Sequence, residues 1–255
     1  MGLFNSAFAP LALLVGYLLG SIPFGLLLTR AAGKGDVRSI GSGNIGATNV
    51  LRTGSKGLAA TTLLLDLAKG TAAVALIAES AKGRMAFDAY QLGYIAGLGA
   101  LLGHIYPVWL AFEGGKGVAT FIGALIGLHW PAALLFGLAW SAVAVAYRYS
   151  SLAALVATGA VVLYYALVGQ AGLLFILIMA ILIFGKHHAN IRRLLAGEEH
   201  RIGARGKGVR APRGLRRARA PAAAASAPYP ESTPYAGVNY ATEAQNICQL
   251  SRKIP

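Results

Sequence analysis

Residues 41–52 form a short polar segment in which glycines alternate with side chains that can donate hydrogen bonds. Glycine lets backbone N–H groups approach a ligand closely, and the guanidinium of Arg52 can hold a phosphate through two parallel hydrogen bonds. The segment therefore predicts a cradle for an anion, although an ordinary turn before a charged helix end is the simpler interpretation of it alone. Its candidate ligands are Gly41, Ser42, Gly43, Asn44, Gly46, Thr48, Asn49 and Arg52.

The same segment contains a formal G-x-G-x-x-G pattern from Gly41 to Gly46, and Asp66 lies 20 residues beyond Gly46. This pattern marks a dinucleotide site only where it follows a buried strand and opens the helix of a βαβ unit. Here the following helix is apolar enough to span a membrane, and Asp66 lies inside that apolar run. The Gly-Lys-Ser/Thr ending of a Walker loop is also missing. We therefore exclude a nucleotide-binding fold.

A second polar segment runs through residues 103–107 and 113–120, where Gly114, Gly115 and Gly117 surround Lys116 just before an apolar run. A helix N-terminus favours anions through its free N–H groups and its macrodipole. The alternative is a plain turn between helices with a lysine that extends toward the membrane surface. For His104 alone, a structural histidine near the end of a span is the simpler interpretation.

A third segment, residues 186–199, follows the last long apolar run. His187 and Asn190 are three residues apart, so on a helix they share one face. Histidine titrates near neutral pH and suits proton transfer. The neighbouring His187 and His188 point to different faces and make a poor metal pair. The alternative is a basic helix that lies on the lipid surface.

The composition sets the class of protein that must position these segments. Of the 255 residues, 56% are hydrophobic and 13% are charged, which excludes a disordered chain. The single cysteine, Cys248, excludes an internal disulfide framework and a multi-cysteine metal site. A net charge of +14 is first a topology signal in such a chain, and we expect no nucleic-acid partner.

Long runs without charge indicate an all-α integral membrane protein, because a helix needs about 20 apolar residues to cross the hydrocarbon core. We expect spans at Phe8–Leu28, Gly57–Ala78 and Tyr90–Phe112. No basic residue precedes the first span, which lacks the n-region of a cleaved signal peptide and is expected to be retained. Asp66 and Lys69 lie three residues apart inside the second span, where a structural ion pair would reduce the cost of burying both charges.

Two longer runs are each expected to contain two helices. Residues 117–147 would break at His129-Trp130-Pro131, because proline disrupts a helix interior but suits its first turn. Residues 149–185 would break at the glycine-rich segment 169–172. The prediction is therefore a polytopic bundle of seven transmembrane helices, some of them short.

The distribution of lysine and arginine predicts the orientation of this bundle. The loop at residues 29–56 carries five basic residues and should be cytoplasmic. The N-terminus is then outside, the C-terminus is cytoplasmic, and all three polar segments lie on the cytoplasmic side. Residues 1–207 are expected to form the membrane domain, and residues 208–255 a disordered basic tail rich in Ala, Pro and Arg.

Together these segments resemble the PlsY family, the membrane-integral bacterial acyl-phosphate-dependent glycerol-3-phosphate acyltransferases. The resemblance covers about residues 10–203 and includes Gly20-Ser21-Ile22-Pro23 and Asp66-Leu67-Ala68-Lys69-Gly70. It implies transfer of a fatty acyl group from acyl phosphate to the 1-hydroxyl of glycerol 3-phosphate, giving lysophosphatidic acid and phosphate. It also implies seven spans, an active site on the cytoplasmic face of the bacterial inner membrane, and a functional link to the enzyme that makes acyl phosphate.

The resemblance also implies roles for individual residues. Ser42 and Arg52 would be essential, the Gly114–Gly117 loop with Lys116 would bind glycerol 3-phosphate, and Glu199 would support the structure. The implied catalytic set is Ser42, Arg52, Lys116, His187 and Asn190, with His104 among the substrate-binding residues. Glu113 departs from the family pattern, which has a basic residue there. No metal or cofactor is required, because the mixed anhydride is already activated.

The proton acceptor stays open at this point, since either His187 or a phosphate oxygen of the donor could take the proton. Two other classes of function also stay open. A transporter for phosphorylated metabolites would explain loops that bind anions, although transporters usually bind near the midplane between internal repeats. A structural protein that recruits partners through its basic tail is the third class. The sequence does not reveal the oligomeric state.

Overall fold

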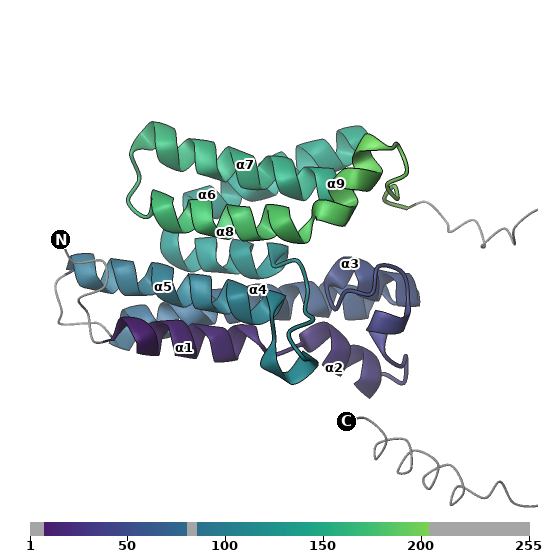
Figure 1. The fold of residues 1–255 in the computed structure, drawn as a ribbon, viewed down its shortest axis with the longest axis horizontal. Coiled ribbons are helices and arrows are strands. Elements are labelled where there is room, and N and C mark those ends of the chain that lie inside the picture. The colour runs from purple at the N-terminus through teal and green to yellow at the C-terminus, as the bar shows by residue number, and fades with distance from the viewer. Residues whose placement is uncertain (1–7, 81–85, 204–255) are drawn as a thin grey trace, which may run out of the picture. The chain divides into compact units, whose positions relative to one another are not determined.

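The computed structural model describes residues 8–80 and 86–203 and, apart from residues 86–89, their side chains. Every regular element among them is a helix, as predicted (Figure 1). The expected tail at 208–255 and the boundary at 207 lie outside the described residues. The longer helices are α1 (Ala9–Gly20), α2 (Phe24–Ala31), α4 (Lys56–Ser80), α5 (Ala86–Ile105), α6 (Val118–Tyr147), α7 (Ser150–Val168), α8 (Leu173–Lys186) and α9 (His188–Leu195); short turns are η1 (Val37–Ser39), α3 (Ala47–Val50), η2 (Leu51–Thr53) and η3 (Val108–Leu110).

Five of the described segments are long and apolar enough to cross a membrane, and a sixth results if α8 and α9, bent by 61°, count as one span. Large apolar side chains such as Leu64, Leu138 and Ile181 are exposed on the outside of the bundle, where lipid would cover them. The structure is therefore that of an integral membrane protein with several spans. The predicted count of seven is not confirmed by these segments and stays a prediction.

Both breaks predicted in the longer runs are present. His129 has non-helical backbone angles (φ −159°, ψ 83°) within α6, directly before the segment that contains Pro131. The chain between α7 and α8 turns through Gly169 and Gly172, whose φ angles of 65° and 90° favour glycine. The first span also breaks, which was not predicted: α1 ends at Gly20, and α2 begins only after Pro23.

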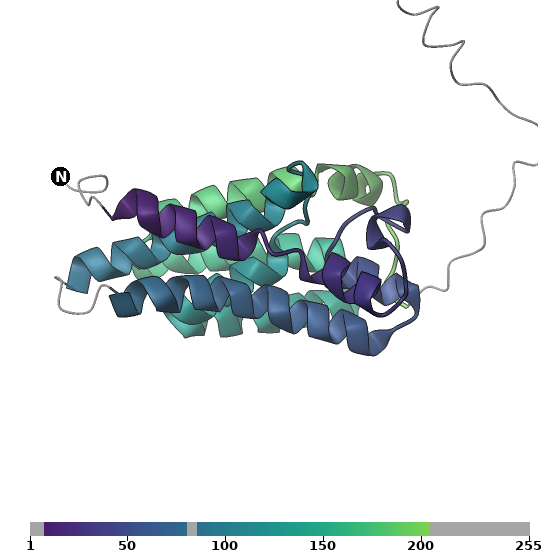
Figure 2. The same ribbon diagram turned by 90° about the horizontal axis from the view of Figure 1, so that it is seen from below.

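Helices α1 and α5 pack through glycines (Figure 2). Gly16 and Gly20 lie against the backbone of Ala96 and Ala100, so that a Cβ atom on either glycine would collide with it. On α5, Gly99 lies in the same way against the α1 backbone. In lipid, where the apolar surroundings provide no hydrophobic drive between helices, such small residues allow the close contact that holds helices together.

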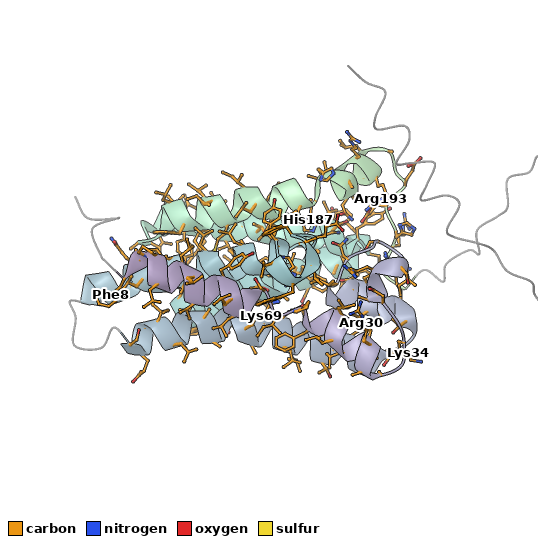
Figure 3. The ribbon with its side chains drawn as sticks, turned by 60° about the horizontal axis from the view of Figure 1, so that its bottom comes forward. Phe8, Arg30, Lys34, Lys69, His187 and Arg193 are labelled. Carbon is orange, nitrogen blue, oxygen red and sulfur yellow. The ribbon has the colours of Figure 1, made fainter. Side chains whose placement is uncertain are left out.

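The helices form two halves joined by α6. In Figure 1, α1, α4 and α5 lie together in one half and α7 and α8 in the other, while α6 packs on both α4 and α7. The main core fills the space between them with Tyr94, Leu101, Phe121, Phe136 and Tyr165. The loops that carry the three polar segments all emerge at the end marked by α2, α3 and α9 in Figure 1. Phe8 lies at the opposite end from Arg30, Lys34 and Arg193 (Figure 3).

Candidate active site

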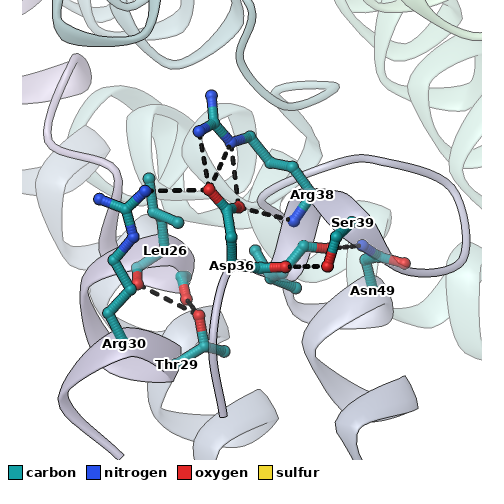
Figure 4. Close-up of polar contacts among 9 residues, drawn as sticks. Leu26, Thr29, Arg30, Asp36, Arg38, Ser39 and Asn49 are labelled. Atoms are coloured by element: carbon teal, nitrogen blue, oxygen red, sulfur yellow. Dashed lines mark hydrogen bonds and ion pairs between the residues drawn. The ribbon is translucent and has the colours of Figure 1, made fainter. Parts of the chain in front are cut away.

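Asn49 organises the first loop, residues 41–52, from inside. Its side chain is 2% exposed. The amide nitrogen donates to the backbone carbonyls of Val37 (2.8 Å), Asn44 (2.8 Å) and Ile40 (3.1 Å), and Figure 4 draws one dashed contact from this amide. The amide oxygen accepts from the Ser42 backbone N–H (3.1 Å) and from Arg52 (3.0 Å). The side chain predicted as a ligand is therefore fully used by hydrogen bonds to residues 37–52.

Several polar side chains of the first loop face outward. Ser42, Thr48 and Arg52 are exposed, and the Arg52 guanidinium keeps a fixed position through its bond to Asn49. Gly41 has a φ of 55°, and a Cβ atom there would meet the Arg52 guanidinium. Only glycine therefore lets the backbone and this cation lie so close. The loop presents a serine hydroxyl and an arginine on one polar surface, as a phosphate site needs.

The second loop, residues 113–117, is fixed to the end of α5 by its backbone. The N–H of Gly114 donates to the carbonyl of Ile105 (3.2 Å), and the N–H of Gly115 donates to that of His104 (3.0 Å). Gly117 has a φ of 84° and caps the start of α6. These contacts place Lys116 at the mouth of that helix, as the sequence predicted.

Lys116 joins the second loop to the third segment. Its Nζ donates to Oδ1 of Asn190 (2.6 Å), and Nδ2 of Asn190 donates to Oε1 of Glu199 (2.6 Å). Glu199 also accepts from Ser151 (2.8 Å) and Arg193 (2.7 Å). The predicted residues Lys116, Asn190 and Glu199 therefore form one continuous network, although 74 residues separate the first pair.

The positive charge of Arg52 acts on Lys116 in this network. Burial is the largest cause that lowers the pKa of Lys116, to about 8, and the positive charges of Arg193 and Arg52 lower it further against the opposing effect of Glu199. At neutral pH the ammonium is still charged and lies in a field of other cations. This is a site poised to receive an anion.

Glu199 balances these cations. Burial alone would raise its pKa, but the hydrogen bonds from Asn190, Ser151 and Arg193 outweigh it, so that the pKa of this carboxyl is lowered. The carboxylate is therefore ionised at neutral pH and holds Asn190 and Arg193 in place. This geometry agrees with the supporting role implied for Glu199.

His187 lies at the bend between α8 and α9 and is 2% exposed. Its Nδ1 donates to the carbonyl of Ile183 (2.8 Å). This bond fixes the ring orientation and, in the neutral ring, leaves Nε2 as a proton acceptor. Asn190 lies one turn further along the same face and is 6% exposed. The shared face predicted for these two residues is thus directed into the bundle.

His104, Asp66 and Lys69 lie below the loops rather than among their exposed side chains. All three are buried, at 3%, 2% and 4% exposure. Asp66 and Lys69 form the predicted ion pair, with Nζ 2.8 Å from Oδ1. Figure 3 shows Lys69 between Phe8 at one end and Arg30 at the other. The structure thus does not place His104 on the open surface of the loops.

The sequence interpretation missed a hollow where the first and second loops meet. It has a volume of about 460 Å³ and is lined by Asp36, Arg38, Ser39, Gly43, Glu113 and Gly114. Asp36 binds Arg38 (2.7 Å) and Arg30 (2.9 Å), as Figure 4 shows. The bond from Arg38 is the largest cause that lowers the pKa of Asp36. The charge pattern of residues 30–38 could have indicated this cluster, but not its position beside Glu113.

Among the described residues, no group of three or more His, Cys, Asp or Glu side chains is arranged to hold a metal ion. The site instead presents cations and a serine hydroxyl. Such a set can bind phosphorylated molecules and stabilise charge that develops on oxygen.

Comparisons with known proteins agree with this arrangement. A family model described as glycerol-3-phosphate acyltransferase matches residues 10–197. A glycerol-3-phosphate acyltransferase of Mesorhizobium japonicum is 62% identical over 198 residues, which cover 77% of this chain and 97% of the relative. One from Brucella canis is 57% identical over 206 residues, which cover 80% and 98% of the two chains.

Two solved structures are also similar. A crystal structure of PlsY, an integral membrane glycerol 3-phosphate acyltransferase, in its glycerol 3-phosphate form has a TM-score of 0.70 and 38% identity, and the match covers 76% of this chain and 96% of that one. The lysophosphatidic acid form has a TM-score of 0.68 and 36% identity, with 76% and 95% covered. The chain belongs to the glycerol-3-phosphate acyltransferase family.

Proposed function

We propose that this member of the glycerol-3-phosphate acyltransferase family transfers a fatty acyl group from acyl phosphate to the 1-hydroxyl of glycerol 3-phosphate, the first acylation step of phospholipid synthesis. The acyltransferase activity with glycerol 3-phosphate follows from the family and from similar structures in substrate and lysophosphatidic acid forms. The observation that carries the proposal is the network of Lys116, Asn190 and Glu199 with Arg52 nearby. Acyl phosphate as the donor is our further proposal.

The donor is supported by the number of cations around the site. Both acyl phosphate and glycerol 3-phosphate carry a phosphate, so the enzyme must hold two anions side by side. Arg52 on the first loop and Lys116 on the second are cations on separate backbone cradles. Each can serve one phosphate next to the reacting groups, whereas an acyl thioester has no phosphate bonded to its carbonyl carbon.

The reaction would proceed by direct transfer. The 1-hydroxyl oxygen of glycerol 3-phosphate attacks the acyl carbonyl carbon, the bond from that carbon to the phosphate oxygen breaks, and inorganic phosphate leaves. Arg52 and Lys116 stabilise the charge that develops on the leaving phosphate and on the carbonyl oxygen. Ser42 donates a hydrogen bond to a phosphate, and Asn190 holds Lys116 in place. Fixing both substrates supplies several kcal/mol of the barrier, about 7–11 in well-oriented model reactions.

For the proton of the attacking hydroxyl, we propose His187 as the acceptor. The bond from its Nδ1 to Ile183 supports this role, because it leaves the lone pair of Nε2 available. A phosphate oxygen of the donor is the alternative acceptor. If His187 acts as the base, replacing it with Ala lowers turnover by about 10²-fold or more. An unchanged rate and pH profile would assign the proton to the donor phosphate.

We also propose seven passages through a bacterial inner membrane, with the site on the cytoplasmic face. Counting the two parts of α6 on either side of His129 as separate helices supports seven. The loops at the site end carry Arg30, Lys34, Arg38, Arg52, Lys116, Arg148, Arg192 and Arg193. By comparison, the sequence between α4 and α5 contains two basic residues, Lys82 and Arg84, and the described residues of the opposite end, at 8–9, 78–80, 129–131 and 168–172, contain none. The positive-inside tendency then makes the site end cytoplasmic, where a soluble enzyme that makes acyl phosphate could deliver its product.

The test uses purified protein in a lipidic phase without added metal. Labelled glycerol 3-phosphate is supplied with palmitoyl phosphate or with palmitoyl-CoA, and lysophosphatidic acid is measured. The proposal predicts product from the acyl phosphate, reduced at least about 10²-fold in Arg52→Ala. The matched control is Arg148→Ala, since Arg148 binds the Ile202 carbonyl at the same end but outside the network. Product from the CoA ester alone would refute the donor, and tight binding of glycerol 3-phosphate without product would favour a transporter.

A further inference from the structure

We propose that Asp66, Lys69 and His104, called here the buried triad, are positioning residues that fix the first and second loops relative to each other. The inference rests on the proposed function, because a reaction between two bound substrates requires the loops that hold them to be aligned. The three side chains lie together beneath the loops, and their polar contacts are with one another and with the backbone at Ile22 and Gly115. These contacts lead from one loop to the other.

The triad reaches the second loop through His104. The carbonyl of His104 accepts the Gly115 N–H at 3.0 Å, and its ring nitrogen Nε2 lies where a Cβ atom of residue 115 would be. The ring therefore supports the backbone directly before Lys116. A shift of His104 would displace both the hydrogen bond and this contact, and with them the lysine at the mouth of α6.

The ring of His104 packs against the ion pair of α4 without a hydrogen bond to it. Nδ1 of His104 lies 3.6 Å from Oδ1 of Asp66, and the same oxygen lies 2.8 Å from Nζ of Lys69. A buried ion pair of this kind is weak evidence for stability, because apolar residues of similar size often stabilise a protein as well or better. Its presence is better explained by the fixed geometry that it imposes on its partners.

The triad reaches the first loop through the broken first span. Nζ of Lys69 donates to the carbonyl of Ile22 (2.9 Å), in the break between α1 and α2. Helix α2 then packs on the first loop, where Gly25 touches the backbone carbonyl of Ile45. Leu26, Val37, Ile45, Val50 and Ala59 form one small core beneath that loop. Lys69 therefore fixes the start of the helix on which the first loop rests.

The expected consequence is a specific loss of turnover. Each loop keeps its own backbone contacts when the triad is removed, so each substrate still binds. The two substrates are no longer aligned, and a misplacement of about 1 Å costs about 10²-fold in rate. The change should therefore appear in kcat, with the KM for glycerol 3-phosphate within about threefold of its original value.

The decisive variant is the double substitution Asp66→Asn with Lys69→Met, which removes both charges and leaves neither one unpaired in the bundle. We expect thermal stability at or above that of the unsubstituted protein, with kcat lowered about 10²-fold. Tyr164→Phe is the matched control, because it removes another polar contact inside the helices, to His129, and should leave kcat unchanged. Unchanged kcat in the folded double variant would overturn the proposal, as would a loss confined to KM.

A second measurement tests the positioning role without relying on activity. Ser39, just before the first loop, and Glu113, in the second loop, both line the hollow. Spin labels at Ser39→Cys and Glu113→Cys report the distance between the two segments once the single native cysteine, Cys248, is serine. The proposal predicts a narrow distance distribution that broadens or shifts in the double variant. An unchanged distribution would overturn it. If the unsubstituted protein makes no product, the proposed function fails, but these distances still decide whether the triad positions the loops.

Discussion

The two ends of the bundle both contain hydrogen-bonded polar networks, but the networks differ in charge. At the site end, Lys116, Asn190 and Glu199 form a charged chain with exposed Arg52 nearby. At the opposite end, hydroxyl groups of tyrosines bond to one another and to a glutamine and a backbone carbonyl. These contacts are Tyr90 to Tyr94 (2.9 Å), Tyr94 to Tyr165 (3.3 Å), Tyr94 to the Ala171 carbonyl (2.9 Å) and Gln170 to Tyr90 (2.8 Å).

The difference in charge distinguishes a network that only stabilises the helices from one that can also bind an anion. The tyrosine hydroxyl groups are bonded to one another and to a backbone carbonyl inside the bundle, and they carry no charge that would attract a phosphate. The ammonium of Lys116 keeps a charge that its carboxylate and amide partners only partly balance, since Arg193 and Arg52 add positive charge. A polar cluster inside a membrane protein therefore indicates an anion site when it contains an excess of positive charge.

The largest effect on turnover should come from removing the positive charge of Lys116. Lys116→Met keeps the length and apolar part of the side chain but removes the ammonium, so developing negative charge loses a close partner. We expect turnover to fall by about 10²–10³-fold, measured as lysophosphatidic acid formed from acyl phosphate. The protein should remain folded, as judged by thermal unfolding. A variant with more than a tenth of the original turnover would show that Lys116 does not stabilise the transition state.

A smaller effect should appear in the pH dependence. Burial lowers the pKa of Lys116 from its usual 10.5 to about 8, so the ammonium is charged below that pH and loses its proton above it. We expect kcat/KM for glycerol 3-phosphate at pH 9 to be about tenfold below its value at pH 7. Lys116→Arg keeps its charge throughout this range, so whatever its absolute rate, its profile should lack this decline. The same decline in both proteins would assign it to another group.

The smallest effect should come from the neutral end. Tyr94→Phe removes the hydroxyl that lies at the centre of the tyrosine network, and hydrogen bonds between membrane helices contribute about 0.6 kcal/mol on average. We expect a decrease of that order in the free energy of unfolding and turnover within about twofold of the original. A large loss of turnover in the folded variant would contradict the division between the two ends.

Much of this arrangement follows from the sequence, because hydropathy and glycine or proline have local effects. The breaks at His129 and at Gly169–Gly172 were predicted from such residues and are present. The convergence of Lys116, Asn190 and Glu199 was also expected, since topology alone brings their segments to one side. The interruption before Pro23 was missed, because the surrounding apolar run hides it.

The functions of individual polar residues were harder to predict. Asn49 stays a predicted ligand, although its amide nitrogen already donates to the carbonyls of Val37, Ile40 and Asn44. His104 was expected at the substrate, but it lies beneath Gly115. Residue type and spacing show that a side chain can donate a hydrogen bond. They do not show whether the fold has already supplied its partner, because such partners come from distant parts of the chain.

The glycine contacts between α1 and α5 have a consequence for how this protein can vary. Gly16 and Gly20 touch a neighbouring backbone, whereas Leu14 and Leu18 on the same helix are exposed toward lipid. In a library of random substitutions, the two leucines should therefore accept almost any apolar residue, while the two glycines should reject even alanine. Helix α1 contains none of the predicted catalytic residues, yet it would contain some of the positions least tolerant of substitution. The pattern of tolerated and rejected substitutions along α1 would show which face packs on another helix, without a structure.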